Sequence, residues 1–198
     1  MRTILRATAL LIAAALPCAA QVSTWPLDPA HSAAQFSVRH IMISTVRGEF
    51  QKLSGTLLLD DKDITKSSVE VIIDATTVDT RVPQRDADLK SANFLDVANF
   101  PTITFKSKSV SAAGEGRLKV TGDLTLHGVT KEVVLDVDGP TPVVKMGNNL
   151  RRGASATTKI NRKDFGINWS RMLDGGGLVV SDEVNITLDV EFVQRAQQ

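Results

Sequence analysis

Residues 118–137 alternate apolar and polar side chains in two stretches that are joined by a tight turn. Successive side chains of a β-strand point to opposite faces, so each stretch predicts a strand with one apolar and one polar face. His127 and Gly128 separate the stretches, and glycine readily adopts the positive φ that a short hairpin turn requires. The apolar faces of this predicted hairpin consist of Leu118, Val120, Leu124, Leu126, Val133, Leu135 and Val137.

The same alternation recurs along most of the chain and predicts eight strands. Evenly spaced strands without a helix between each pair favour a barrel or a sandwich over an α/β fold. Gly55 interrupts the longest of them, which suggests a bend or bulge there. The predicted strands lie at about 32–40, 47–60, 67–75, 102–110, 116–126, 131–138, 153–161 and 183–193.

One segment departs from the strand pattern. Pro83 is well placed to begin a short helix that runs to Ser91, because proline is tolerated in the first turn. Asp86 and Lys90 would form a favourable pair one turn apart. Leu89 is the only strongly apolar residue in the segment, so we expect a surface or rim helix.

The first twenty residues have the composition of a secretory signal peptide. Arg2 and Arg6 precede a short apolar run, which Pro17 ends, and Ala20 completes a small-residue cleavage site. A lipid anchor at Cys18 is the alternative, but the residues before it fit a lipidation site poorly. We therefore expect cleavage after residue 20, a single domain at 21–198 and a periplasmic location.

Charge, cysteine content and hydropathy limit what the protein can bind and how it is stabilised. The chain has 23 basic and 22 acidic side chains, so no basic surplus favours binding to nucleic acid. Its one cysteine lies in the expected signal peptide, so the core must provide the stability. No later segment is apolar and long enough to predict a membrane-spanning helix.

The interior of an eight-stranded barrel can be filled by side chains or can hold one small ligand, and periodicity does not distinguish the two. Aromatic residues make up 5% of the chain, and tyrosine is absent. Valine, leucine, isoleucine and alanine would therefore form the inner wall, and such side chains fill a barrel less completely than large rings do.

Seven motifs, spread over nearly the whole chain after residue 20, together resemble the YceI-like, polyisoprenoid-binding family of exported bacterial proteins. At Asp88 the chain departs from many members, which have histidine there. The motifs are LDPAHS at 27–32, FSVRH at 36–40, RDADLKSANFLD at 85–96, FPTITF at 100–105, GDLTLHGVTK at 122–131, NRKDFG at 161–166 and DEV at 182–184.

The resemblance implies an all-β, lipocalin-like antiparallel barrel with an apolar channel that encloses a polyisoprenoid chain, such as a quinone tail. The expected function is that of a periplasmic carrier whose partner is an amphiphilic isoprenoid lipid. The sequence does not distinguish this ligand from fatty acids or fatty amides, and it leaves open that two copies associate as a homodimer. The alternatives are a filled barrel that acts as an interaction module in stress or respiratory complexes, and an enzyme that modifies such a lipid.

The inward positions of the predicted strands are candidate ligand contacts, and each could equally be ordinary core packing. Two aromatic residues near the glycine-rich segment 175–177 could cap the channel or cover the end of the barrel. The candidates are Phe36, Val38, Phe50, Leu58, Val71, Ile73, Ile103, Phe105, Leu124, Leu126, Phe165, Trp169, Ile186 and Leu188.

Catalytic and metal-binding patterns are not found in the sequence. The three histidines follow no ligand spacing and no Ser-His-Asp or Cys-His arrangement occurs, so we predict no catalytic residue, no metal and no cofactor other than the bound lipid. Asp86 and Asp88 are two positions apart on the predicted helix and would not face each other. An alternative role for Arg85 or Asp86 is contact with a polar head group at the channel mouth.

Overall fold

The computed structural model describes residues 22–174 and 176–196. The predicted signal peptide, residues 1–20, lies outside this part of the chain. The described chain forms one antiparallel sheet of twelve strands. They are β1 (Val22–Pro26), β2 (Ala33–His40), β3 (Ser44–Phe50), β4 (Leu53–Asp60), β5 (Ser68–Asp74), β6 (Val78–Asp79), β7 (Thr102–Ala112), β8 (Arg117–Leu126), β9 (Val129–Asp138), β10 (Val144–Met146), β11 (Asn149–Asn161) and β12 (Glu183–Arg195).

The helices are short and lie at the ends of the strands. One α-helix, α1 (Pro83–Lys90), is found in the described chain, and it agrees with the predicted helix. Four 3-10 turns occur at Pro29–His31, Ile64–Lys66, Ala75–Thr77 and Arg162–Phe165. Within residues 22–174 and 176–196, no helix is long and apolar enough to cross a bilayer.

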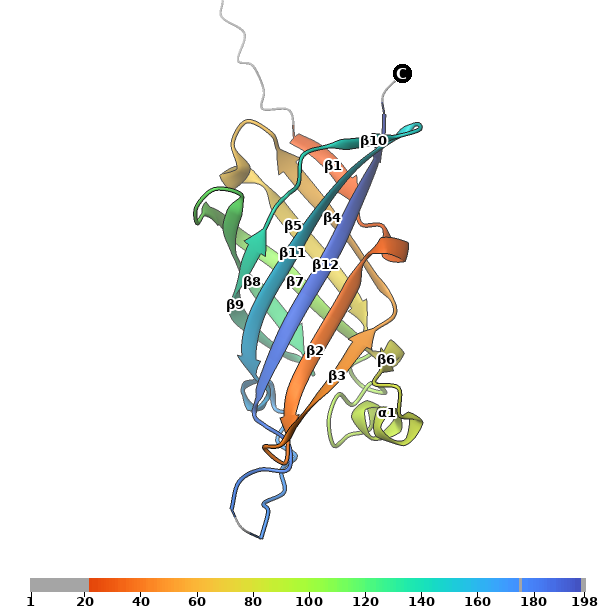
Figure 1. Cartoon of the computed structure of the whole chain (residues 1–198), viewed down its shortest axis with the longest axis vertical. Helices are drawn as coiled ribbons and strands as arrows, with labels where there is room; N and C mark the ends of the chain where they lie inside the picture. Colours follow the sequence, from red (N-terminus) through yellow and green to blue (C-terminus); the bar gives the residue numbers. More distant parts are fainter. Residues whose placement is uncertain (1–21, 175, 197–198) are drawn as a thin grey trace, which may run out of the picture.

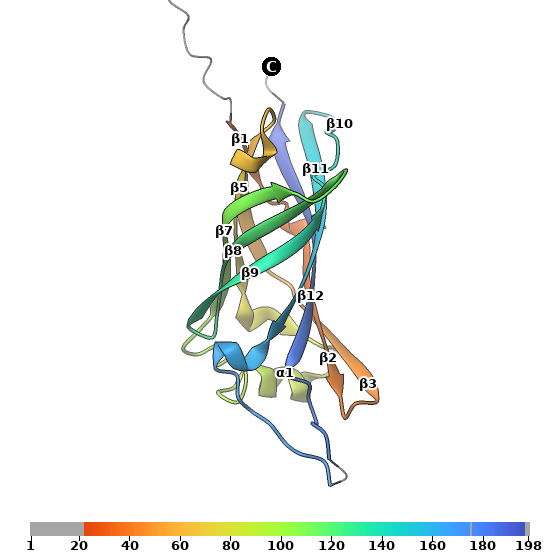
Figure 2. The ribbon, with the colours of Figure 1, turned by 90° about the vertical axis from the view of Figure 1, so that its left-hand side faces the viewer.

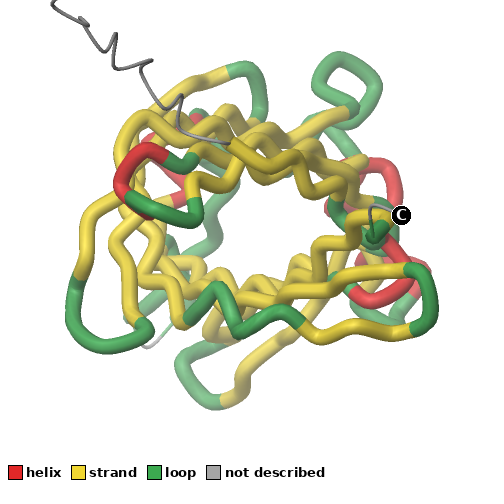
Figure 3. The backbone as a smooth tube through the Cα atoms, turned by 90° about the horizontal axis from the view of Figure 1, so that it is seen from above, coloured by secondary structure: helices red, strands yellow, loops and turns green. Residues whose placement is uncertain are grey.

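The sheet curls into an elongated barrel (Figures 1 and 2). Its strand order is β1-β4-β5-β7-β8-β9-β11-β12-β2-β3-β6, and β10 pairs with β11. The two residues after Pro26, the end of β1, connect β4 to β12. The amide of Leu27 donates to the carbonyl of Gly55 at 2.9 Å, and the amide of Asp28 donates to the carbonyl of Glu191 at 2.7 Å. Seen along the long axis, the strands surround the interior (Figure 3). The upper end of the barrel is here the end with β10, and the lower end is the end with α1 (Figure 1).

The hairpin of β8 and β9 has the predicted register. Leu126 pairs with Val129, and the two turn residues have positive φ, 52° at His127 and 73° at Gly128. Glycine is required at Gly128 for a second reason, because a Cβ there would lie 2.4 Å from the ring of Phe100. The alternating apolar side chains of this hairpin face the interior, where they join the larger of two buried clusters.

The predicted number of strands is wrong, although the all-β antiparallel class is confirmed. The stretch 47–60 is two strands, because the chain turns at Gln51 and Lys52. The short strands β1, β6 and β10 were not predicted, because strands of two to five residues show too little alternation. Gly55 lies in regular register opposite Val71, so the expected bulge is not there. The irregularity is in β7, between Ser107 and Ser109.

Candidate functional site

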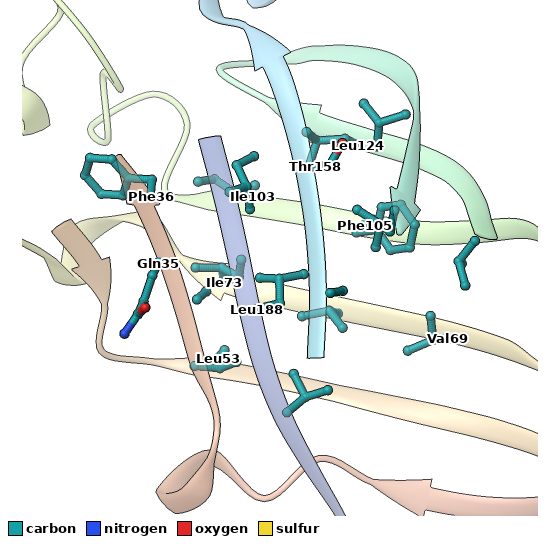
Figure 4. Close-up of a pocket in the computed structure, with 18 of the residues that line it drawn as sticks. Gln35, Phe36, Leu53, Val69, Ile73, Ile103, Phe105, Leu124, Thr158 and Leu188 are labelled. Carbon is teal, nitrogen blue, oxygen red and sulfur yellow. The ribbon is translucent and has the colours of Figure 1, made fainter. Parts of the chain in front are cut away.

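An elongated apolar cavity of about 280 Å³ lies inside the barrel. Side chains from β2, β3, β4, β5, β7, β8, β9, β11 and β12 line it, and almost all of them are aliphatic or aromatic. Figure 4 shows Ile73, Ile103 and Leu188 converging on this space from three different strands. The interior is therefore not filled by the protein's own side chains.

Small residues on β11 and β2 help to keep the interior open. Ala156 is 7% exposed and lines the cavity, and it pairs with Leu188 on one side and Val137 on the other. Ala34 on β2 also lines the cavity and is 3% exposed. Methyl groups at these positions cannot reach across the barrel, because facing sides of a barrel this wide need longer side chains to meet.

Most of the predicted site residues lie where the alternation placed them. Their side chains reach the cavity from six strands, although whether they contact a ligand stays a prediction. The predicted residues that line the cavity are Phe36, Val38, Phe50, Val71, Ile73, Ile103, Phe105, Leu124, Leu126, Ile186 and Leu188.

The predicted inward placement of Leu58 is wrong. Its side chain is 41% exposed, whereas its neighbours Leu57 and Leu59 line the cavity. The error follows from treating 47–60 as one strand. Because the chain turns at Gln51 and Lys52, the positions that face inward change from even-numbered to odd-numbered. Phe50 of β3 faces inward, and in β4 the odd-numbered positions do so.

Two predicted aromatic residues are at the lower end but are not part of the cavity wall. Phe165 is 2% exposed and its carbonyl oxygen lies 3.1 Å from Nδ1 of His127. Trp169 packs against Phe94, with ring centroids 5.3 Å apart, and Phe94 itself lines the cavity. Both residues therefore cover the end of the barrel, as the packing alternative predicted.

Several wall residues were not named among the candidate ligand contacts. Some are strand positions with clear alternation that were not singled out, such as Val120, Leu135, Val184 and Val190. Leu89 is the one strongly apolar residue of α1, so the helix gave no apolar face, and Phe94 and Leu95 follow that helix in irregular chain without a periodic signal. The wall residues not named as candidates include Ala34, Leu53, Leu57, Leu59, Val69, Leu89, Phe94, Leu95, Val120, Leu135, Ala156, Val184, Val190 and Phe192.

Arg162 is a charged residue in the cavity wall, and it is only 4% exposed. Its guanidinium donates to the carbonyls of Ser181 at 3.1 Å and Ile167 at 2.7 Å, and to Oδ1 of Asp182 at 2.9 Å. Burial lowers the pKa of Arg162, and the charge of Asp182 opposes that shift. All three guanidinium nitrogens thus donate to protein oxygens, and these hydrogen bonds stabilise the lower end of the barrel.

Arg85 and Asp86, the candidates for head-group contact, both bind Thr80. The Asp86 carboxylate accepts from the Thr80 amide at 2.8 Å and from its hydroxyl at 2.5 Å. Arg85 donates to the Thr80 hydroxyl and carbonyl, both at 2.8 Å. Neither residue lines the cavity, and their observed contacts tie α1 to the end of β6. Their contact with a head group stays a prediction.

A cluster of charges lies on the outside of the upper end. Asp28, His31 and Glu191 have ligand atoms within 4.8 Å of one another. Arg151 donates to Oδ2 of Asp28 at 2.8 Å and also to Glu191, so a cation of the protein already occupies the centre of the group. His31 and Arg151 lower the pKa of Asp28, and Glu191 and Asp28 raise that of Arg151. This network joins the first 3-10 turn to β11 and β12.

The fold and the cavity define an antiparallel β-barrel with an interior suited to an apolar small molecule. Residues 25–192 match the family model for the YceI-like domain. The chain belongs to the YceI-like family, which confirms the resemblance found in the sequence.

A sequence relative agrees with this assignment, and two solved structures share the fold. A UPF0312 protein of Vibrio parahaemolyticus is 39% identical over 173 residues, which cover 84% of this chain and 89% of that one. The crystal structure of BcnA from Burkholderia cenocepacia has a TM-score of 0.71 at 23% identity and covers 83% of this chain and 98% of that one. A domain from Saccharophagus degradans, described as polyisoprenoid binding, has a TM-score of 0.62 at 17% identity and covers 89% of this chain and all of its own, 100%.

Proposed function

We propose that this protein is a periplasmic carrier that holds one polyisoprenoid lipid, such as the tail of a quinone, in its barrel. The observation that carries the proposal is the elongated cavity lined almost entirely by hydrocarbon side chains. Such a wall removes a branched, insoluble chain from water by shape and apolar contact, without specific polar partners.

The size of the cavity supports a ligand of at least two isoprene units. A packed water-sized group takes roughly 30 Å³, so 280 Å³ holds on the order of nine carbon-sized groups, or about two five-carbon units. At about 0.8 kcal/mol for each buried CH₂, one unit contributes about 3–4 kcal/mol before costs. Each further unit that the barrel encloses adds a similar amount, and about three or four would exceed several kcal/mol of association cost and leave micromolar affinity or better.

The two alternatives receive less support. A filled barrel that serves only as an interaction module would not contain a cavity of this volume. The family and the polyisoprenoid-binding neighbour favour binding over catalysis. We therefore assign no catalytic residue, and we infer that the lipid leaves the barrel unchanged.

Extraction of the protein purified from its own host tests the proposal, with native mass spectrometry of the intact complex beside it. A prenyl lipid recovered at about one per chain is expected. A fatty acid or fatty amide instead would replace the isoprenoid assignment, and chemically altered lipid after incubation would favour an enzyme. Protein that is empty both as purified and after incubation with prenyl alcohols would contradict the carrier.

A pair of variants tests whether the cavity is the site. Leu124 is 9% exposed and faces the cavity, so Leu124→Arg should abolish lipid uptake by placing a charge in the apolar interior. Val134 is 42% exposed on the outer face, and Val134→Arg is the matched control. Circular dichroism checks that both variants are folded. Normal lipid content in folded Leu124→Arg would refute the assignment of the cavity.

A further inference from the structure

Large apolar side chains project from the lower end of the barrel. Met42 is 58% exposed, Ile43 76% and Met172 65%, and these three residues are here called the apolar tip. They come from two segments, the turn between β2 and β3 and the segment that precedes β12. Both segments extend below the body of the barrel (Figures 1 and 2). Exposed apolar groups that gather at one place commonly mark an interaction site.

Hydrogen bonds hold the two segments side by side. The amide of Ile41 donates to the carbonyl of Val179 at 2.8 Å, and His40 forms a β-bridge with Val180. Packing joins them as well, since a Cβ built on Gly177 would lie 3.7 Å from Cγ of Met42. The two segments that carry the apolar tip are therefore connected, although they are far apart in the sequence.

The backbone of this turn is strained. Ile41 has a φ of 44° and Met42 a φ of 61°, a region that L-residues other than glycine seldom adopt. The guanidinium of Arg39 stabilises this conformation by donating to the carbonyls of Met42 and Ile43, both at 2.9 Å. The turn keeps this strained conformation although it exposes apolar side chains to water. Such strain points to a functional surface.

Positive charge surrounds the apolar tip. Arg39, Arg47 and Arg171 lie in the two segments or directly beside them, and Asp174 is the one acidic residue between 166 and 180. Among the described residues, none of these three arginines has a carboxylate within ion-pair distance. Both terminal nitrogens of Arg39 already donate within the turn. Guanidinium groups without an acidic partner, as in Arg47 and Arg171, are suited to bind phosphate oxygens.

The opposite end of the barrel provides a comparison. Its β10 hairpin exposes Val144 and Met146, by 60% and 67%. Two arginines next to that hairpin are paired with acids, Arg151 with Asp28 and Glu191 and Arg152 with Asp61. Lys145 in β10 and Arg195 opposite Asn149 have no acidic partner among the described residues. Exposed apolar residues and unpaired cations thus occur at both ends, so substitutions at the upper end test which end docks.

We propose that the apolar tip docks the protein onto an anionic phospholipid surface. Met42, Ile43 and Met172 enter the boundary between head groups and acyl chains, while Arg47 and Arg171 bind lipid phosphates. The neighbouring Val180 lines the cavity, so docking places the lower end of the cavity at the bilayer. This last step, which makes the bilayer the source or destination of the ligand, rests on the proposed function.

Flotation with phospholipid vesicles tests the docking. The purified protein should float with vesicles that contain phosphatidylglycerol, bind pure phosphatidylcholine far less, and be released by high salt. The double variant Met42→Asp, Ile43→Asp should reduce binding about tenfold or more, and Arg47→Glu about fivefold or more. The matched control Val144→Asp, Met146→Asp at the upper end should bind as the unchanged protein does.

Separate measurements distinguish this proposal from the carrier function. All the substituted residues lie outside the cavity wall, so circular dichroism and the lipid content by native mass spectrometry should be unchanged in each variant. Failure of the unchanged protein to bind anionic vesicles, or an equal loss in the upper-end control, would overturn the docking. A dimer in solution that the tip variant dissociates would show that a second copy covers the tip, and would also overturn it.

Discussion

Partial filling of the cavity gives the sharpest test of how the barrel binds its ligand. Ala156 lies in the middle of β11, is 7% exposed and borders the open space. Ala156→Leu adds three carbon atoms that point into that space. The change removes room for the ligand without adding charge or polarity, so it tests volume alone.

The expected magnitude follows from the cavity. Because the added carbons of the leucine occupy part of the 280 Å³, they displace about three carbons of the ligand. Each lost carbon costs about 0.8 kcal/mol of burial, or about 2 kcal/mol in total. The dissociation constant should therefore rise roughly 30- to 60-fold. The free energy of unfolding should stay unchanged or rise by about 1 kcal/mol, because an apolar void is filled.

Calorimetric titration with geranylgeraniol, a prenyl alcohol of four isoprene units, measures the dissociation constant, and thermal unfolding of the lipid-free protein measures stability. Ala112 is exposed at the end of β7, so Ala112→Leu is a control that adds the same atoms on the outside. Undiminished affinity in a folded Ala156→Leu variant would refute the reasoning. A marked loss of stability would show that the space is too tight to accept the leucine.

Three further predictions concern single positions. Leu57→Asp should remove lipid binding and lower the unfolding temperature, whereas Leu58→Asp should leave both nearly unchanged, because only Leu57 faces the cavity. Stability should fall as the pH drops below about 3.9 and through the lowered pKa of Asp28, because protonation breaks its pairing with Arg151. Asp28→Asn should flatten this acid-side fall in a plot of unfolding temperature against pH. Met42→Gly should raise the free energy of unfolding by about 0.5–1 kcal/mol, because glycine relieves the strain of a positive φ. Unchanged stability in chemical denaturation would show that the turn is not strained.

Local alternation was enough to determine the class of fold and most of the wall. In the hairpin of β8 and β9, side chains two positions apart share a face, so Val120, Leu124 and Leu135 could be placed inside without any knowledge of their neighbours. The start of α1 at Pro83 could also be predicted from local sequence, because proline restricts its own backbone.

Tertiary structure decided the features that depend on residues distant in the sequence. The turn at Gln51 and Lys52 reverses the parity of β4, so Leu58 faces outward although its own stretch alternates correctly. The contact of β1 with β12 and the buried bonds of Arg162 both need partners from separate segments.

The open interior and the apolar tip also belong to the tertiary structure. Whether a barrel is empty depends on the summed volumes of side chains from opposite walls, and Ala34 and Ala156 contribute little to that sum. The turn that carries Met42 and the segment that carries Met172 come together only when the chain folds. Periodicity reports which side chains share a face of one strand, whereas space and surface arise from how the strands are assembled.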